Sequence, residues 1–87
     1  MFEAVQFVEE RGGIDPTETV LGEFESETDA VTAARAGRSA FLATSGTDYA
    51  WWIVRKKGAT LAEFIADSTS DKEFVLDLNS GELIPIS

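Results

Sequence analysis

The chain of 87 residues contains neither histidine nor cysteine. Histidine is the commonest general base and metal ligand near neutral pH, and cysteine is a frequent nucleophile and soft metal ligand. Their absence excludes Ser-His-Asp and Cys-His catalytic sites, zinc sites made of these two residues, redox dithiols and disulfides. The reactive groups that remain are carboxylates, hydroxyls, three lysines and four arginines.

Long apolar runs are also missing, although 44% of the residues are hydrophobic. No run is long enough to cross a bilayer, and the start of the chain lacks the basic and apolar regions of a signal peptide. We therefore expect one domain over residues 1–87, located in the cytoplasm. The Ala-rich composition, with slightly more Arg than Lys, resembles that of short proteins from high-GC bacteria or their phages, and it carries no motif of a named family.

Acidic residues outnumber basic residues by 16 to 7, which gives a net charge of −9. Residues 1–34 and 58–87 are acidic, whereas residues 35–57 are basic. An acidic surface of this size repels nucleic-acid phosphates and anionic membranes. We expect neither as a partner, but an acidic face could meet a basic protein.

Alternating apolar residues predict strands over residues 2–10, 19–25, 48–57, 61–66, 73–78 and 82–86. A capping box at Ser26–Asp29 predicts a helix that ends near residue 43. Short turns between strands imply antiparallel pairing. The predicted fold is α+β, an antiparallel sheet of about five strands with one helix packed on a face. Its order is ββαβββ, with one of the candidate strands shortened or lost.

The predicted helix has one face made almost wholly of small residues, namely Ala30, Ala33, Ala34, Gly37, Ala40 and Phe41. Small side chains allow a helix to lie close to a sheet. Glycine at position 37 is less favourable for the helix than alanine by about 1 kcal/mol, and a close contact with the sheet would explain its presence. We expect Arg35 and Arg38 to point away from this contact.

Local signals make further predictions about the strands. In the second strand, alternation places Val20 and Phe24 on one face and Leu21 on the other. Gly81 suits a left-handed turn position before the last strand. Pro85 lacks an N–H, so this last strand is expected at an edge of the sheet.

The segment Asp48–Lys57 places Tyr49 and Trp51 on one side of a strand and Trp52 on the other. One helix covers only one sheet face, so apolar side chains on the other face need a partner. We therefore predict a homodimer, with Tyr49, Trp51 and Trp52 as candidate interaction residues. An unidentified protein partner is the alternative.

Other motifs are incomplete. The segment Asp67–Glu73 resembles the start of a calcium loop, but Lys72 and Leu78 stand where the loop requires glycine and a bidentate acid. The serines have no histidine that could act as their general base.

We predict no catalytic, cofactor-binding or metal-binding residue. The sequence favours a small acidic non-enzymatic interaction or regulatory module. The alternatives are an acidic inhibitor of the antitoxin or DNA-mimic type, and a carboxylate-dependent enzyme.

Overall fold

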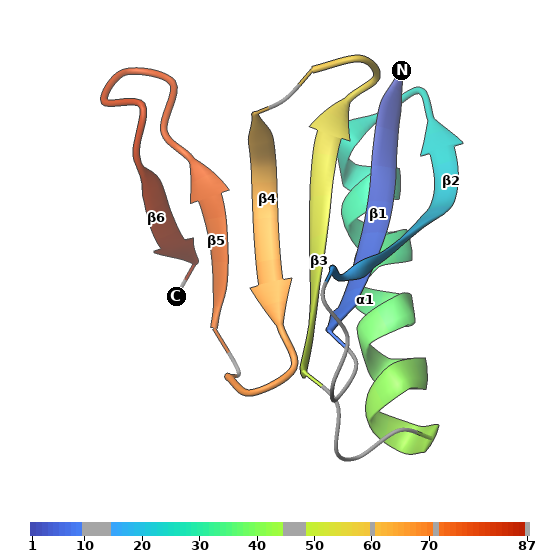
Figure 1. Cartoon of the computed structure of the whole chain (residues 1–87). Coiled ribbons are helices and arrows are strands. Elements are labelled where there is room, and N and C mark those ends of the chain that lie inside the picture. The colour runs from blue at the N-terminus through green and yellow to red at the C-terminus, as the bar shows by residue number, and fades with distance from the viewer. Residues whose placement is uncertain (10–14, 45–48, 60, 71, 87) are drawn as a thin grey trace.

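The computed structural model describes residues 1–9, 15–44, 49–59, 61–70 and 72–86. Its elements follow the order ββαββββ (Figure 1). They are β1 (Phe2–Glu9), β2 (Thr17–Phe24), α1 (Glu27–Thr44), β3 (Tyr49–Lys56), β4 (Ala62–Asp67), β5 (Glu73–Leu76) and β6 (Leu83–Ile86).

The six strands form one antiparallel sheet in the order β2-β1-β3-β4-β5-β6. The predicted α+β class and the helix packed on an antiparallel sheet are confirmed. The sheet has six strands where about five were expected, because β5 and β6 both form around a tight turn. In that turn Gly81 has a φ of 73°, as predicted, and its N–H donates to the carbonyl of Asp77 at 2.7 Å.

Strand β6 lies at an edge of the sheet, as Pro85 predicts. The N–H of Asp77 donates to the carbonyl of Glu82 at 2.8 Å, so that this pair is hydrogen-bonded. Hydrogen-bonded and non-hydrogen-bonded pairs alternate along an antiparallel ladder. The pair of Phe74 with Pro85, three steps further, is therefore non-hydrogen-bonded. The missing N–H of Pro85 faces outward, where it interrupts the row of donors along the edge.

Helix α1 begins with the predicted cap, in which Ser26 Oγ accepts the N–H of Asp29 at 3.1 Å. It packs on β1, β2 and β3, and in Figure 1 it lies behind these strands while β4, β5 and β6 extend beyond it. The buried core lies between α1 and the sheet. Its members are Ala4, Ala30, Ala34, Phe41, Ala50, Trp52, Val54, Phe64 and Ala66.

Gly37 makes the close contact that its place in the helix predicts. A Cβ atom at this position would lie 2.8 Å from Leu21 Cδ1 and 3.2 Å from Trp52 Nε1. Trp52 is fully buried, and its indole N–H donates to Gln6 Oε1 at 2.9 Å. The glycine thus makes room for a buried tryptophan whose polar group is satisfied. Ala40, expected on the same face, is exposed.

The expectation that Val20 and Phe24 share one face of β2 is wrong because of a β-bulge. Gly22 pairs with Ala4 and Val20 pairs with Val5, which leaves Leu21 as the extra residue. An extra residue reverses the side-chain alternation beyond it. Leu21 and Val20 lie on opposite faces, as expected, with Leu21 toward α1 and Val20 on the face of Val5. Phe24, however, packs against the core on the α1 side and does not share the face of Val20.

The expectation that Arg35 and Arg38 point away is also wrong. Arg35 donates from Nε and Nη2 to the two carboxylate oxygens of Glu73, at 2.8 and 2.7 Å. Arg38 donates to the carbonyl oxygens of Asp67 and Ser70, each at 2.8 Å. Both side chains therefore link α1 to the β4–β5 hairpin, which the helix itself does not cover.

Helix α1 contains no stretch both long and apolar enough to span a bilayer; only the described residues bear on this finding.

Candidate interaction face

The sheet has a second face, opposite α1, which we call the open face. Ala4, Trp52 and Phe64 point into the core under α1, so their neighbours along each strand point the other way. Strand register then aligns the open-face side chains across four strands. They are Val5, Phe7, Tyr49, Trp51, Ile53, Ile65 and Phe74.

Aromatic rings dominate one end of the open face. The rings of Phe7 and Trp51, which are cross-strand partners, stack with centroids 5.3 Å apart and planes 11° from parallel. The Tyr49 ring lies 5.6 Å from that of Trp51. Such pairs contribute about 0.5–1.5 kcal/mol beyond the area that they bury. The rings form a connected group on β1 and β3.

Beside this group the face is already partly covered by its own side chains. Val5 is fully buried and Ile53 is 9% exposed, although no described element lies over this face. Large neighbouring side chains on the same face exclude water from these two positions. The exposed apolar side chains of this face are therefore concentrated at the aromatic end and not spread over the whole face.

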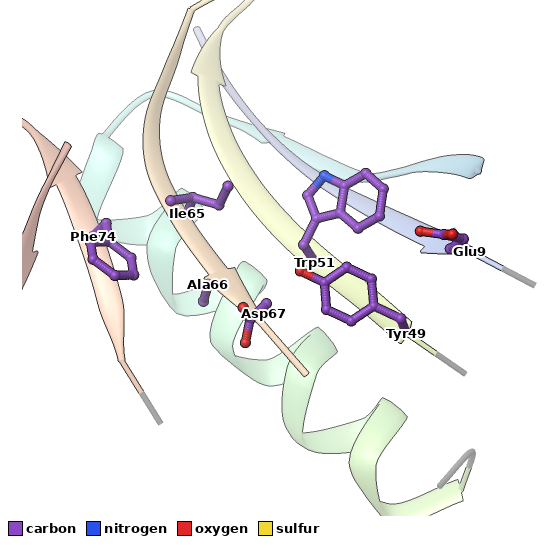
Figure 2. Close-up of a pocket in the computed structure, with 7 residues that line it drawn as sticks. All are labelled: Glu9, Tyr49, Trp51, Ile65, Ala66, Asp67 and Phe74. Atoms are coloured by element: carbon purple, nitrogen blue, oxygen red, sulfur yellow. The ribbon is translucent and has the colours of Figure 1, made fainter. Parts of the chain in front are cut away.

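A hollow of about 380 Å³ opens at the aromatic end (Figure 2). Tyr49 and Trp51 come from β3, Phe74 from β5, and two carboxylates come from the ends of β1 and β4. The complete lining comprises Glu9, Tyr49, Trp51, Ile65, Ala66, Asp67 and Phe74. The hollow therefore combines aromatic rings with acidic groups.

The carboxylate of Asp67 is held in place by the loop that follows β4. Its Oδ1 atom accepts the N–H of Thr69 at 3.1 Å and the N–H of Ser70 at 2.8 Å. These bonds form an Asx-type turn, which orients the side chain without help from a ligand. The segment that resembled a calcium loop is thus a hydrogen-bonded turn at Asp67, while Asp71 lies outside the described residues.

The environment of Tyr49 is both apolar and negative. Burial raises the pKa of this phenol above its usual value of 10.0, and the carboxylates of Asp67 and Glu9 raise the pKa further. A hydrogen bond to Asp67 acts in the same direction. All four effects disfavour the phenolate, because burial removes water, a nearby negative charge repels another, and the hydrogen bond requires the phenol proton. Tyr49 is therefore a neutral hydroxyl at physiological pH.

The structure separates the three candidate interaction residues. Tyr49, 40% exposed, and Trp51 lie together on the open face. Trp52 lies on the other side of the sheet and is fully buried; its ring centroid lies 5.5 Å from that of Phe41, with the two ring planes at 69°. Trp52 thus belongs to the core under α1 and offers no surface to a partner.

Sequence reasoning did not find Glu9, Asp67, Ile65 and Phe74 as part of the site. Asp67 faces Trp51 across the β3–β4 pair, and Phe74 faces Ile65 across the β4–β5 pair. The alternation of each strand shows which side chains share a face, but only the register shows which of them meet.

A second hollow, of about 400 Å³, lies on the α1 side, next to the part of β4–β6 that the helix leaves uncovered. Arg35 borders it, paired with Glu73, and Glu63 Oε2 is buried there without a hydrogen-bond partner in the described part of the chain. Arg35 also lies 5.9 Å above the Phe64 ring. The guanidinium of Arg35, which borders this hollow, is thus already paired with a carboxylate of the same chain.

Metal coordination requires several convergent oxygen, nitrogen or sulfur ligands. Within the ranges that the structure describes, no three Asp or Glu side chains come together in a way that could hold a metal ion.

Comparison with known proteins finds no similar family. No protein-family model, no curated protein and no solved structure matches the chain.

Proposed function

We propose that this protein is a non-enzymatic, cytoplasmic protein-interaction module that binds its partner through the aromatic end of the open face. The observation that carries the proposal is the group of Phe7, Tyr49 and Trp51 beside a hollow, on a sheet face that no described element covers. Tryptophan and tyrosine are the residues most enriched where protein interfaces gain their binding energy.

The lining of the hollow favours binding over catalysis. Rings and aliphatic side chains provide most of its wall, and its polar side-chain groups are two carboxylates, one phenol and the indole N–H of Trp51. A carboxylate-dependent enzyme, the alternative considered above, needs acidic groups held at a defined separation about the reacting bond, as in glycoside hydrolysis. A partner side chain needs only an apolar surface and complementary charge.

Affinity capture with open-face variants tests the proposal. The tagged protein and a Tyr49→Ser, Trp51→Ser double variant are incubated with extracts of the cells that naturally express the protein. Leu42→Ser, at a position 43% exposed on α1, is the matched control. We expect the control to retain the partner and the double variant to lose it, because Tyr49 and Trp51 supply the contact. Circular dichroism establishes that each variant is folded. Equal capture by the double variant and the control contradicts the proposal.

The exposed side chains of β6 favour a second candidate, self-association. Leu83, Ile84 and Ile86 are 39–43% exposed, and Leu78 in the preceding turn is 82% exposed. Ile84, opposite Val75, and Ile86, opposite Glu73, point to the α1 side of the sheet, where Leu78 and Ile86 border the second hollow, whereas Leu83 points to the open face. We call Leu78, Ile84 and Ile86 the C-terminal apolar surface. The homodimer predicted from the sequence is therefore proposed with this surface, since Val5 and Ile53 on the open face are already buried. Light scattering at increasing salt concentration tests this candidate.

A further inference from the structure

We propose that the hollow on the open face receives an arginine side chain from a basic partner protein. The inference rests on the proposed function and names the chemistry of its partner. The hollow brings together aromatic rings and two carboxylates from separate strand ends, as Figure 2 shows.

The rings supply the first part of the recognition. Trp51 and Tyr49 on β3 and Phe74 on β5 border the hollow from the two sides of β4. A cation near an aromatic ring is attracted by the electron density of the ring face, and tryptophan is the best ring for this purpose. A guanidinium is planar and weakly hydrated, so it can stack on a ring more readily than a lysine ammonium.

The carboxylates supply the second part. Asp67 is already oriented by the N–H groups of Thr69 and Ser70, and Glu9 lies exposed at the rim. A carboxylate and a guanidinium can form two parallel hydrogen bonds, which adds geometric selectivity to the attraction of charge. Because Asp67 is held before binding, little side-chain freedom has to be lost when a ligand arrives.

Charge identifies the partner as basic. No lysine or arginine lines the hollow among the described residues, and the whole chain carries a net charge of −9. Arg38 approaches Asp67 by hydrogen-bonding its main-chain carbonyl. A basic partner is attracted over long range, whereas a second copy of this chain is repelled. An apolar partner would bury the two carboxylates without supplying a positive charge to pair with them.

Peptide titration followed by NMR tests the inference. The probe is the peptide Gly-Gly-Arg-Gly-Gly, and its control carries citrulline, the uncharged counterpart of arginine. The indole N–H signals of the two tryptophans report on different parts of the protein. Trp51 borders the hollow, whereas Trp52 is buried and hydrogen-bonded to Gln6. We expect the arginine peptide to shift the Trp51 signal in a saturable way, with the Trp52 signal unchanged. The citrulline peptide should bind about fivefold or more weakly.

A pair of variants with the same change of charge localises the effect. Glu9→Gln removes an acid at the hollow, whereas Glu25→Gln removes an exposed acid that does not line it. We expect Glu9→Gln to weaken arginine-peptide binding about threefold and Glu25→Gln to leave it nearly unchanged. The effect of Glu9→Gln should diminish with added salt. Trp51→Leu should remove saturable binding, as followed by isothermal calorimetry.

Several results overturn the inference. Equal binding of the arginine and citrulline peptides excludes recognition of the cation, and equally tight binding of a lysine peptide excludes recognition of the guanidinium. Equal weakening by Glu9→Gln and Glu25→Gln means that only the overall charge matters. A Trp51 signal that shifts with protein concentration, without peptide, assigns the hollow to a second copy.

The two proposals can fail separately. If capture of the cellular partner depends on Tyr49 and Trp51 but the arginine peptide does not bind, the interaction face is retained and the arginine is excluded. If the peptide binds but capture is unaffected by the double variant, the hollow is an arginine site and the proposed function is wrong.

Discussion

Tyr49 is the single tyrosine of the chain and borders the hollow together with two other rings and two acids. Its ionisation can therefore be followed by ultraviolet absorbance without interference from another phenol. We expect its pKa to lie above 10.0, because burial and the charge of Asp67 both disfavour the phenolate. Asp67→Asn should lower this pKa, yet leave it above 10.0, since burial is the largest cause. A pKa at or below 10.0 in the wild type would contradict this environment.

The pair of Arg35 with Glu73 contributes a pH-dependent part of the stability. The hydrogen bonds from Arg35 lower the pKa of Glu73 below its usual value of 4.5. A lowered pKa in the folded state means stability that is present above the unfolded value and is lost as the pH falls through the folded value. The contribution is modest, because the Arg35 side chain is 52% exposed and screened by water.

We expect Glu73→Gln to reduce the free energy of unfolding by about 0.5 kcal/mol at pH 7. The difference from the wild type should shrink below pH 4.5 and disappear once Glu73 is protonated in the folded protein. Urea unfolding at a series of pH values measures this difference. Glu25→Gln serves as the control at an exposed acid. A difference that persists at the lowest pH would show that packing, and not charge, accounts for the loss.

At the scale of elements, helix α1 and strand β3 depend on small side chains at their contact. Ala34 and Ala30 are buried against the sheet, and Gly37 leaves space for Trp52. Overpacking a site of this kind forces the neighbouring side chains out of their preferred rotamers. The helix is further held by Arg35 and Arg38, which reach the β4–β5 hairpin.

Ala34→Leu should therefore lower the free energy of unfolding by about 1–3 kcal/mol, because the larger side chain has no room. Ala36→Leu adds the same side chain at an exposed position of the same helix, and it should leave the stability within about 0.5 kcal/mol of the wild type. The urea midpoints of the two variants give the comparison. Equal midpoints would place the docking face of α1 elsewhere.

The whole molecule combines a strongly acidic surface with an apolar edge. The net charge of −9 opposes association of two copies, whereas the C-terminal apolar surface on β6 favours it. Screening by salt weakens the repulsion but not the burial of apolar side chains. The balance between the two effects is thus adjustable by ionic strength.

We expect the molar mass from light scattering to rise toward that of a dimer as salt is added. Ile84→Glu should abolish this rise, because it places a charge on the C-terminal apolar surface. Leu42→Glu introduces the same charge at a position that is also 43% exposed, and it should dimerise like the wild type. A monomer mass at micromolar concentration in both low and moderate salt would exclude the proposed dimer.

Sequence alone determined those features whose causes are local. The cap at Ser26, the left-handed turn at Gly81 and the edge position of Pro85 each depend on a few neighbouring residues or on a missing N–H. The close contact between α1 and the sheet at Gly37 was likewise predictable, because a glycine within a helix indicates that a neighbour leaves no room for a side chain. Together with the alternation of apolar residues, these signals were enough for the α+β class and the helix on an antiparallel sheet.

The tertiary structure alone decided how distant residues meet. The bulge at Leu21 reversed the side-chain alternation between the two parts of β2 that flank it. The β3–β4 register brought Asp67 opposite Trp51. Arg35 and Arg38 extend to a hairpin about thirty to forty residues away. Register and side-chain direction depend on packing across the whole sheet, because a shift of one residue places every side chain on the other face. The hollow that carries both proposals exists only once that register is set.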